Sequence, residues 1–138
     1  MSDRYLRIKE KISRNELIIL DGGVGTELQK RGIEMDGSWC GSASLNTEIL
    51  KQVHLDYIEA GAEIITANTY ASSRLMLNSA GLGENFEEIN EKAINSAKSA
   101  RREVENEDIL IAGSLSHRLP IEDGAAQSDP STNISEER

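Results

Sequence analysis

The sequence predicts an α/β fold in which short parallel strands alternate with helices. Two observations carry this prediction: apolar runs of strand length recur along the chain, and the segments between them space their apolar residues as amphipathic helices do. The order strand, helix, strand, helix, strand is typical of parallel βαβ units, which close right-handedly. The 138 residues suffice for one domain with a core of its own.

The first predicted strand is Leu17 to Leu20, a continuous apolar run that ends at Asp21-Gly22-Gly23. An uninterrupted apolar run suits a parallel strand buried on both faces, and the glycines suit a tight turn after it. The charged segment 1–15 before this strand is expected to form an N-terminal helix or extension. It contains no apolar run resembling a signal peptide.

A second unit follows. Apolar residues at helical spacing predict a helix from Asn46 to Ala60, which either Asn46 or Thr47 would cap at its start. Gly61 stands where many helices end in a left-handed glycine. The apolar stretch Ala62 to Ala67 then predicts the second strand.

A third unit completes the series. We expect a short helix from Ser72 to Leu82, a long helix from about Asn85 to Glu105, and a third strand from Ile109 to Ala112. The folded region would therefore span residues 16–116. Both prolines lie beyond it and apolar residues become sparse, so residues 117–138 are expected to form a loop or disordered tail.

Composition excludes several classes of protein. The chain has 15 Lys and Arg against 24 Asp and Glu, a net charge of -9, and no basic stripe, so a nucleic-acid partner is not expected. No segment approaches the roughly 20 apolar residues of a membrane span. A single cysteine allows no intrachain disulfide, and a cytoplasmic location is the default expectation.

The sharpest local feature is the Asp21-Gly22-Gly23 turn. A carboxylate at the carboxyl end of a buried parallel strand lies where α/β folds bind ligands. Asp21 would bind a substrate ammonium group, with the backbone donors of Gly22 and Gly23 beside it. The alternative is turn chemistry without a ligand. Nucleotide binding is not expected, because Leu28 replaces the third glycine of a dinucleotide fingerprint and no Gly-Lys-Ser/Thr is present.

Polar residues also follow the second predicted strand. Thr66 and Asn68 would hydrogen-bond a small polar substrate there, and Tyr70 would cover it with its ring. The alternative is that Thr and Asn only cap the end of the strand. Two neighbouring strands that both end in polar residues favour a binding site at this edge of the sheet.

Trp39, Cys40 and His54 carry weaker signals. Trp39 would either form an aromatic wall for a sulfonium or quaternary ammonium group, or pack under a loop. Cys40 has no evident base or metal partner and is expected to be a small buried residue. His54 is expected at the border of a helix's apolar face. One cysteine and two scattered histidines predict no metal site.

Four segments in combination resemble the homocysteine S-methyltransferase family, which includes the homocysteine-binding module of cobalamin-dependent methionine synthase. They are Leu20 to Leu28 (LDGGVGTEL), Val53 to Gly61 (VHLDYIEAG), Ala62 to Ser72 (AEIITANTYAS) and Ile111 to Ser114 (IAGS). Each segment is weak alone, and their order and spacing make the combination specific. The resemblance covers roughly Glu16 to Ser116.

The resemblance implies the first three or so β/α units of a TIM-type (β/α)8 barrel that transfers a methyl group to the sulfur of homocysteine, giving methionine. It implies that zinc binds the homocysteine thiol and favours the thiolate. The substrate-binding positions it implies are Asp21, Gly22, Gly23, Thr66, Asn68 and Tyr70. Asp21 would hold the amino group of homocysteine, and Trp39 would face the methyl donor.

The chain departs from the family in one respect. A full barrel needs about 250 residues, and the family's zinc is held by three cysteines in later strands, which Cys40 cannot replace. We therefore expect a truncated or split chain that does not bind zinc tightly or methylate homocysteine alone. Its partner would be a complementary C-terminal half or another copy of the chain. The alternatives are a non-catalytic binding or oligomerisation module derived from this fold, or a decayed gene product.

The sequence does not select the methyl donor. S-methylmethionine, S-adenosylmethionine, betaine and methylcobalamin all remain open, because donor contacts in this family lie partly in segments that the chain lacks.

Overall fold

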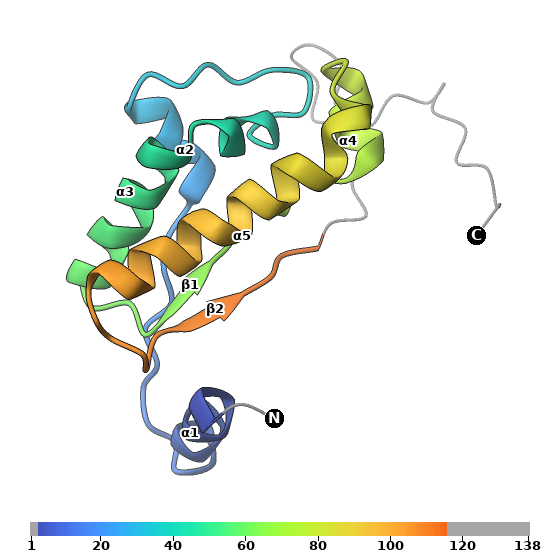
Figure 1. Cartoon of the computed structure of the whole chain (residues 1–138). Helices are drawn as coiled ribbons and strands as arrows, with labels where there is room; N and C mark the ends of the chain where they lie inside the picture. The colour runs from blue at the N-terminus through green and yellow to red at the C-terminus, as the bar shows by residue number, and fades with distance from the viewer. Residues whose placement is uncertain (1–2, 116–138) are drawn as a thin grey trace, which may run out of the picture.

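Helices form one layer over a short sheet in the computed structural model, which describes residues 3–115 (Figure 1). The elements, in chain order, are α1 (Asp3–Ser13), α2 (Val24–Lys30), the 3-10 helix η1 (Ser42–Leu45), α3 (Thr47–Glu59), β1 (Ile64–Thr66), α4 (Arg74–Ser79), the 3-10 helix η2 (Gly83–Asn85), α5 (Phe86–Glu103) and β2 (Leu110–Ala112). The three predicted helices after residue 45 and the last two predicted strands are confirmed, with ends that shift by a few residues. The predicted tail, 117–138, lies outside the described residues.

The sheet has the predicted parallel topology. β1 pairs with β2 so that Ile64 lies beside Leu110 and Thr66 beside Ala112. On the other side of β1, Leu20 forms a single parallel bridge with Ile64. Three segments therefore run in the same direction, and their carboxyl ends meet at one edge.

The first predicted strand differs from expectation. Residues 17–19 are not part of a strand, and the only ladder contact is the Leu20 bridge. Leu17 is 92% exposed and Leu20 61% exposed, so the expected burial on both faces is wrong. A parallel strand is buried only where both of its faces are covered. Residues 3–115 cover the face of the sheet opposite the helices only in part: Leu20 is exposed there, and Ile64 and Leu110 are half-buried.

The helix-facing side of the sheet is closely packed. Ile65 is fully buried and packs in one cluster with Ala62, Ala97 and Ile109, and Ile111 packs against this cluster. Because side chains alternate along a strand, Ile64 and Thr66 point to the opposite face. The sheet therefore has one face under α3 and α5 and one open face.

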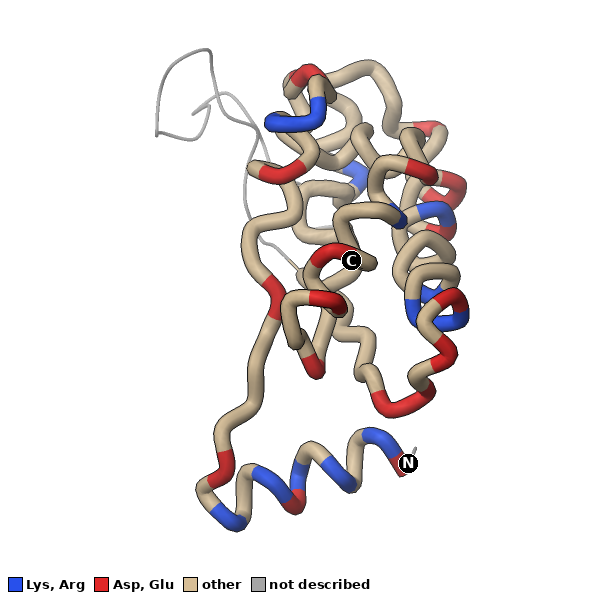
Figure 2. The backbone as a smooth tube through the Cα atoms, turned by 90° about the vertical axis from the view of Figure 1, so that its left-hand side faces the viewer, with Lys and Arg blue, Asp and Glu red and all other residues tan. Residues whose placement is uncertain are grey.

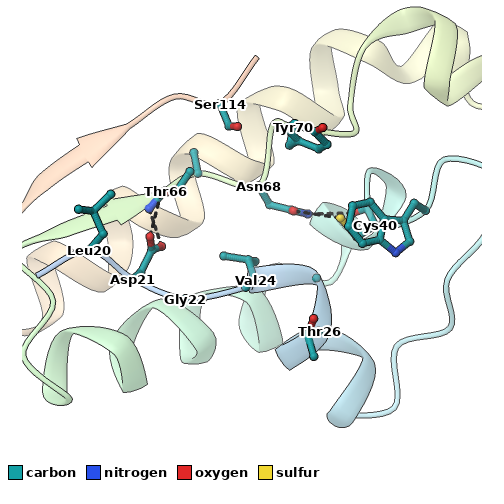
Figure 3. Close-up of a pocket in the computed structure, with 14 residues that line it drawn as sticks. Leu20, Asp21, Gly22, Val24, Thr26, Cys40, Thr66, Asn68, Tyr70 and Ser114 are labelled. Carbon is teal, nitrogen blue, oxygen red and sulfur yellow. Dashed lines mark hydrogen bonds between the residues drawn. The ribbon is translucent and has the colours of Figure 1, made fainter. Parts of the chain in front are cut away.

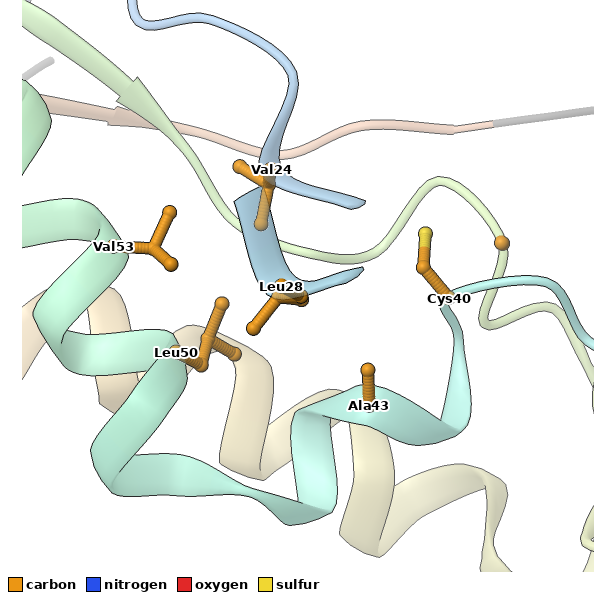
Figure 4. Close-up of a cluster of buried hydrophobic side chains, with 7 residues drawn as sticks. Val24, Leu28, Cys40, Ala43, Leu50 and Val53 are labelled. Carbon is orange, nitrogen blue, oxygen red and sulfur yellow. The ribbon is translucent and has the colours of Figure 1, made fainter. Parts of the chain in front are cut away.

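A second apolar cluster holds α2 and the connection after it against α3 (Figure 4). Its buried members are Val24, Leu28, Cys40, Ala43, Leu50, Val53 and Ala71. Leu28 and Leu50 are fully buried. Side chains of this size contribute about 1.5–3 kcal/mol each when buried. This cluster fixes α2, and with it the turn that precedes the helix.

The ends of α3 confirm one predicted cap and correct another. Gly61 has a φ of 101°, its N–H donates to the Ile58 carbonyl, and the N–H of Ala62 donates to the Tyr57 carbonyl. This is the Schellman pattern that the glycine predicts. At the other end, Asn46 occupies the N-cap position, but its side chain makes no capping hydrogen bond. Its ψ of 65° departs from the extended conformation that side-chain capping usually needs.

Helix α1 is held at the amino ends of the strands by charge rather than by packing. None of its residues is buried. Its ion pairs with the rest of the chain are Arg4–Glu107, Arg7–Asp108 and Lys11–Glu63. Figure 2 shows α1 as an arm below the main body, with several basic residues along it. Ion pairs at partly exposed positions contribute little each and weaken in salt.

His54 is more deeply buried than its sequence position predicts. We expected it at the border of the apolar face of α3, and it is fully buried because α3 packs against α5, α2 and β1 together. Neither ring nitrogen has a hydrogen-bond partner in the described part of the chain. Burial lowers the pKa of His54 to about 4, against an opposing effect of the Asp21 charge. The ring is therefore neutral at pH 7.

Replacement of His54 by Leu tests this burial. The unfolded chain takes up a proton near pH 6.5 that the folded chain takes up only near 4. Wild-type stability is therefore complete above pH 6.5 and falls as the pH falls toward 4. At about 1.4 kcal/mol per pKa unit the loss is about 3 kcal/mol. Urea unfolding at pH 7.0, 5.5 and 4.5 should show a smaller acid loss in the variant. Equal acid losses in the two proteins would contradict the burial.

Candidate functional site

The carboxyl ends of the strands open into a pocket of about 420 Å³, which we call the strand-end pocket. Its lining residues are Leu20, Asp21, Gly22, Gly23, Val24, Gly25, Thr26, Trp39, Cys40, Thr66, Ala67, Asn68, Tyr70 and Ser114. All seven positions predicted for substrate or methyl donor are among them. The parallel topology brings six of the seven together, because Asp21 to Gly23 follow the first segment while Thr66, Asn68 and Tyr70 lie at the end of β1 or after it. Trp39 joins them from the connection between α2 and η1.

Asp21 and Thr66 lie side by side in the lining of the pocket, at the part that we call its floor (Figure 3). The Thr66 backbone N–H donates to Asp21 Oδ2 at 2.6 Å, and the Thr66 hydroxyl donates to Asp21 Oδ1 at 2.8 Å. The Asp21 N–H in turn donates to the carbonyl of Ile64 at 3.0 Å. A carboxylate has about four acceptor sites. Two of them remain for a ligand while Asp21 joins the first segment to β1.

An added side chain would meet different surroundings at the two glycines of the turn. A Cβ on Gly22 would lie 2.7 Å from the Tyr57 hydroxyl oxygen, so a side chain there would displace the Tyr57 ring on α3. A Cβ on Gly23 would come no closer than 3.4 Å, to the Thr26 hydroxyl, and Gly23 has an ordinary φ of -71°. Nothing in the described chain requires a glycine at position 23. Its bare backbone faces the pocket.

Asn68 ties the connection before α3 to the end of β1. Its Nδ2 donates to the Cys40 carbonyl at 2.8 Å and to Ser44 Oγ at 3.0 Å, and its Oδ1 accepts from the Cys40 thiol at 3.6 Å. The side chain is 4% exposed. Both amide hydrogens are therefore used within the protein, and a free lone pair on Oδ1 is what Asn68 offers to a ligand.

Two aromatic side chains line the outer part of the pocket. Trp39 is 41% exposed and Tyr70 is 39% exposed, although the neighbours Ser38, Cys40 and Ala71 are buried. Figure 3 shows Tyr70 and Asn68 on the segment that follows β1. Aromatic faces of this kind attract sulfonium and quaternary ammonium groups.

Ser114 is a lining residue that was not predicted from the sequence. It follows β2, lines the pocket, and is joined to Thr69 by two hydrogen bonds: its N–H donates to Thr69 Oγ1 at 2.9 Å, and its carbonyl accepts from that hydroxyl at 2.7 Å. The signal that could have found it is the one used for Asp21 and Thr66, a polar residue close to the carboxyl end of a predicted parallel strand.

The described residues do not fit a zinc site. Residues 3–115 contain no group of three or more His, Cys, Asp and Glu side chains that could hold a metal ion. Burial raises the pKa of the Cys40 thiol to about 11, whereas a zinc ligand must be a thiolate. Cys40 is instead a buried member of the core, as its sequence context predicted.

The described helices also bear on membrane insertion. In the part of the chain that the structure covers, no helix is long and apolar enough to cross a membrane.

Comparisons with known proteins agree on one family. The profile of the homocysteine S-methyltransferase family matches residues 18–137. Homocysteine S-methyltransferase 4 of Zea mays is 33% identical over 87 residues, 61% of this chain and 25% of that protein. Betaine–homocysteine S-methyltransferase 1 of Danio rerio is 34% identical over 113 residues, 79% of this chain and 27% of that protein.

A solved structure gives the same result. The metallated form of the homocysteine methyltransferase MmuM from Escherichia coli matches with a TM-score of 0.64 and 31% identity, over 76% of this chain and 40% of that one. The chain thus spans from a quarter to two fifths of the length of these relatives. The family match also extends through the segment that we predicted to be a tail.

Replacement of Thr66 by Val tests the floor of the pocket. Valine keeps the β-branched shape and the backbone N–H but removes the hydroxyl that donates to Asp21. A hydrogen bond to a charged group contributes about 1.5–3 kcal/mol, and we expect a loss of unfolding free energy near the lower value. Thr26→Val is the matched control, because Thr26 lines the same pocket and its exposed hydroxyl makes no such bond. Equal urea midpoints for the two variants would contradict the role of Thr66.

Proposed function

Because the chain belongs to the homocysteine S-methyltransferase family, we propose that residues 3–115 bind the amino-acid end of homocysteine in the strand-end pocket. In the full barrel this places the substrate for methyl transfer to its sulfur, which gives methionine. The observation that carries the proposal is the Asp21 carboxylate, which lies at the floor of the pocket with two acceptor sites beyond those that Thr66 uses.

The ammonium group of the substrate would bind Asp21. A charge-assisted hydrogen bond of this kind is shorter and about twice as strong as a neutral one. Thr66 holds the carboxylate in place before the ligand arrives, so little orientational freedom is lost on binding. The half-buried position of Asp21 reduces the screening of its charge by water.

The carboxylate group of the substrate would meet the backbone N–H groups at Gly22 and Gly23. The bare backbone of Gly23 supports this assignment, because the chain itself leaves room for a side chain there. A glycine that packing does not require is expected where a ligand approaches the main chain closely. Asn68 and Tyr70 would line the neighbouring wall.

Trp39 and Tyr70 would face the methyl donor. All the donors that the sequence left open present the methyl group from a cation or a cobalt centre, and a cationic donor would be attracted to their rings. The matched relatives include proteins named for betaine and proteins that are not. The donor is therefore left unassigned.

Methyl transfer would require more of the barrel than residues 3–115. The described residues hold no metal cluster, and the solved relative from Escherichia coli is a metallated form. We propose that zinc is held by cysteines outside these residues, in a complementary C-terminal part of the barrel, and that the described part does not methylate homocysteine alone. The open face and the single-sided pairing of β2 are where that part would dock.

Replacement of Asp21 by Asn tests the proposed binding. Asparagine can accept from the Thr66 N–H and donate to its hydroxyl, so the fold is expected to survive, while the charge opposite the ammonium is lost. Affinity for L-homocysteine, measured by isothermal titration calorimetry, should fall about 10- to 100-fold, as expected for a hydrogen bond to a charged group. Glu91→Gln removes an exposed charge on α5 and should bind as the wild type does.

Replacement of Gly23 by Ala provides an independent test. The added methyl group has room within the chain, so the unfolding free energy should change by less than about 1 kcal/mol, while homocysteine binding weakens.

A wild-type protein that binds no homocysteine, yet forms stable dispersed dimers, would instead favour a non-catalytic oligomerisation module. Tight binding by both Asp21→Asn and Gly23→Ala would place the ligand elsewhere.

A further inference from the structure

Trp39 has an unusual backbone conformation for a large aromatic residue. Its φ is 61°, in the left-handed region that costs a residue with a Cβ roughly 1–2 kcal/mol. Its neighbours Ser38 and Cys40 are buried, at 0% and 4% exposure, while its own side chain is 41% exposed and lines the strand-end pocket. Residues in strained backbone conformations cluster at functional sites. The strain at Trp39 therefore makes its exposed ring a candidate for a role in ligand binding.

A turn built on Asp36 holds Trp39 in this conformation. The N–H of Trp39 donates to the Asp36 carbonyl at 2.7 Å, and the N–H of Asp36 donates back to the Trp39 carbonyl at 3.2 Å. The Asp36 carboxylate closes the turn from the other side. Its Oδ1 accepts from the Ser38 N–H at 2.8 Å and from the Ser38 hydroxyl at 2.6 Å, and its Oδ2 accepts from the Ser42 hydroxyl.

The turn is anchored to the body of the protein at its far end. Ser38 Oγ accepts from the Ser42 N–H at 3.1 Å, and the Cys40 carbonyl accepts from Asn68. Gly41 lies against the main chain of Ala71 so closely that a Cβ would clash with it. Ser38, Cys40 and Gly41 are therefore held in place on both sides of Trp39, and the Asp36 carboxylate links Ser38 to Ser42 across this segment.

We propose that Asp36 is a positioning residue for Trp39, which sets the direction of the indole ring over the outer part of the strand-end pocket. The relevance of this direction to the methyl donor rests on the proposed function. The positioning itself does not, because it follows from hydrogen bonds within residues 36–42. Asp36 acts through Trp39 and does not line the pocket itself.

The chain offers a direct readout, since Trp39 is its only tryptophan. Fluorescence excited at 295 nm therefore reports on this ring alone. In Asp36→Ala, which removes every carboxylate contact of the turn, we expect quenching by acrylamide to increase about twofold and the steady-state anisotropy to fall, because the ring samples more orientations on the nanosecond timescale. Asp36→Asn should restore wild-type values, since an amide can accept from Ser38 and donate to Ser42.

Two controls make the outcome decisive. Glu34→Ala removes an exposed carboxylate from the same connection and should leave both values unchanged. Ser42→Ala removes one of the three contacts to the carboxylate and should give a smaller change in the same direction. If Asp36→Ala fails to fold, as judged by circular dichroism, Ser42→Ala and Asp36→Asn decide the question. Unchanged quenching and anisotropy in Ser42→Ala and in folded Asp36→Ala would overturn the proposal.

A titration with tetramethylammonium separates the positioning from the donor role. If Trp39 faces a cationic donor, the cation should change the Trp39 emission of the wild type and of Asp36→Asn, with an affinity at least about fivefold weaker in Asp36→Ala. A wild type that does not respond would count against the donor role of Trp39. The quenching data would then still confirm or overturn the positioning by Asp36.

Discussion

The rest of the site depends on the contact between Asp21 and Thr66. One carboxylate accepts from both the backbone N–H and the hydroxyl of Thr66, while the Asp21 N–H donates to Ile64. These bonds hold the turn after the first segment to the end of β1, although the first segment itself has only one ladder bridge. Together with the cluster that fixes α2, the contact holds the glycines of the turn beside the end of β1. The same carboxylate lines the pocket and has about two acceptor sites that Thr66 does not use.

Much of this arrangement was predictable from the sequence, because the helices after residue 45 have one apolar face and the strands are short apolar runs between them. Parallel order then places Asp21 and Thr66 at the same edge. The exposure of Leu17 and Leu20 was not predictable from local pattern, because it depends on what covers the open face of the sheet. The prediction that His54 lies at the border of the apolar face was wrong for a related reason. Its position on α3 is at the border of one apolar face, and packing by α5, α2 and β1 together encloses it.

The polar residues of the pocket divide into those that hold the site together and those that remain available to a ligand. A sequence motif does not separate these roles. Asn68 follows β1 just as Thr66 ends it, yet both of its amide hydrogens bind the connection before α3. Gly22 and Gly23 are adjacent and identical, yet only at the first would a Cβ displace a neighbouring side chain. Trp39 is held at a positive φ by a turn whose hydrogen bonds appear only once the chain is folded. Three-dimensional contacts therefore assign the roles, while the sequence identifies the candidates.

In the function that we propose, Asp21 both joins the strand segments and binds the amino group of homocysteine. A crystal structure of this chain grown with L-homocysteine tests it most directly. We expect the amino nitrogen of the ligand within about 3.2 Å of an Asp21 carboxylate oxygen, the distance of an N–H···O hydrogen bond. Both contacts between Thr66 and the Asp21 carboxylate should be retained. A ligand bound away from the strand-end pocket, or an Asp21 side chain turned away from Thr66, would contradict the claim.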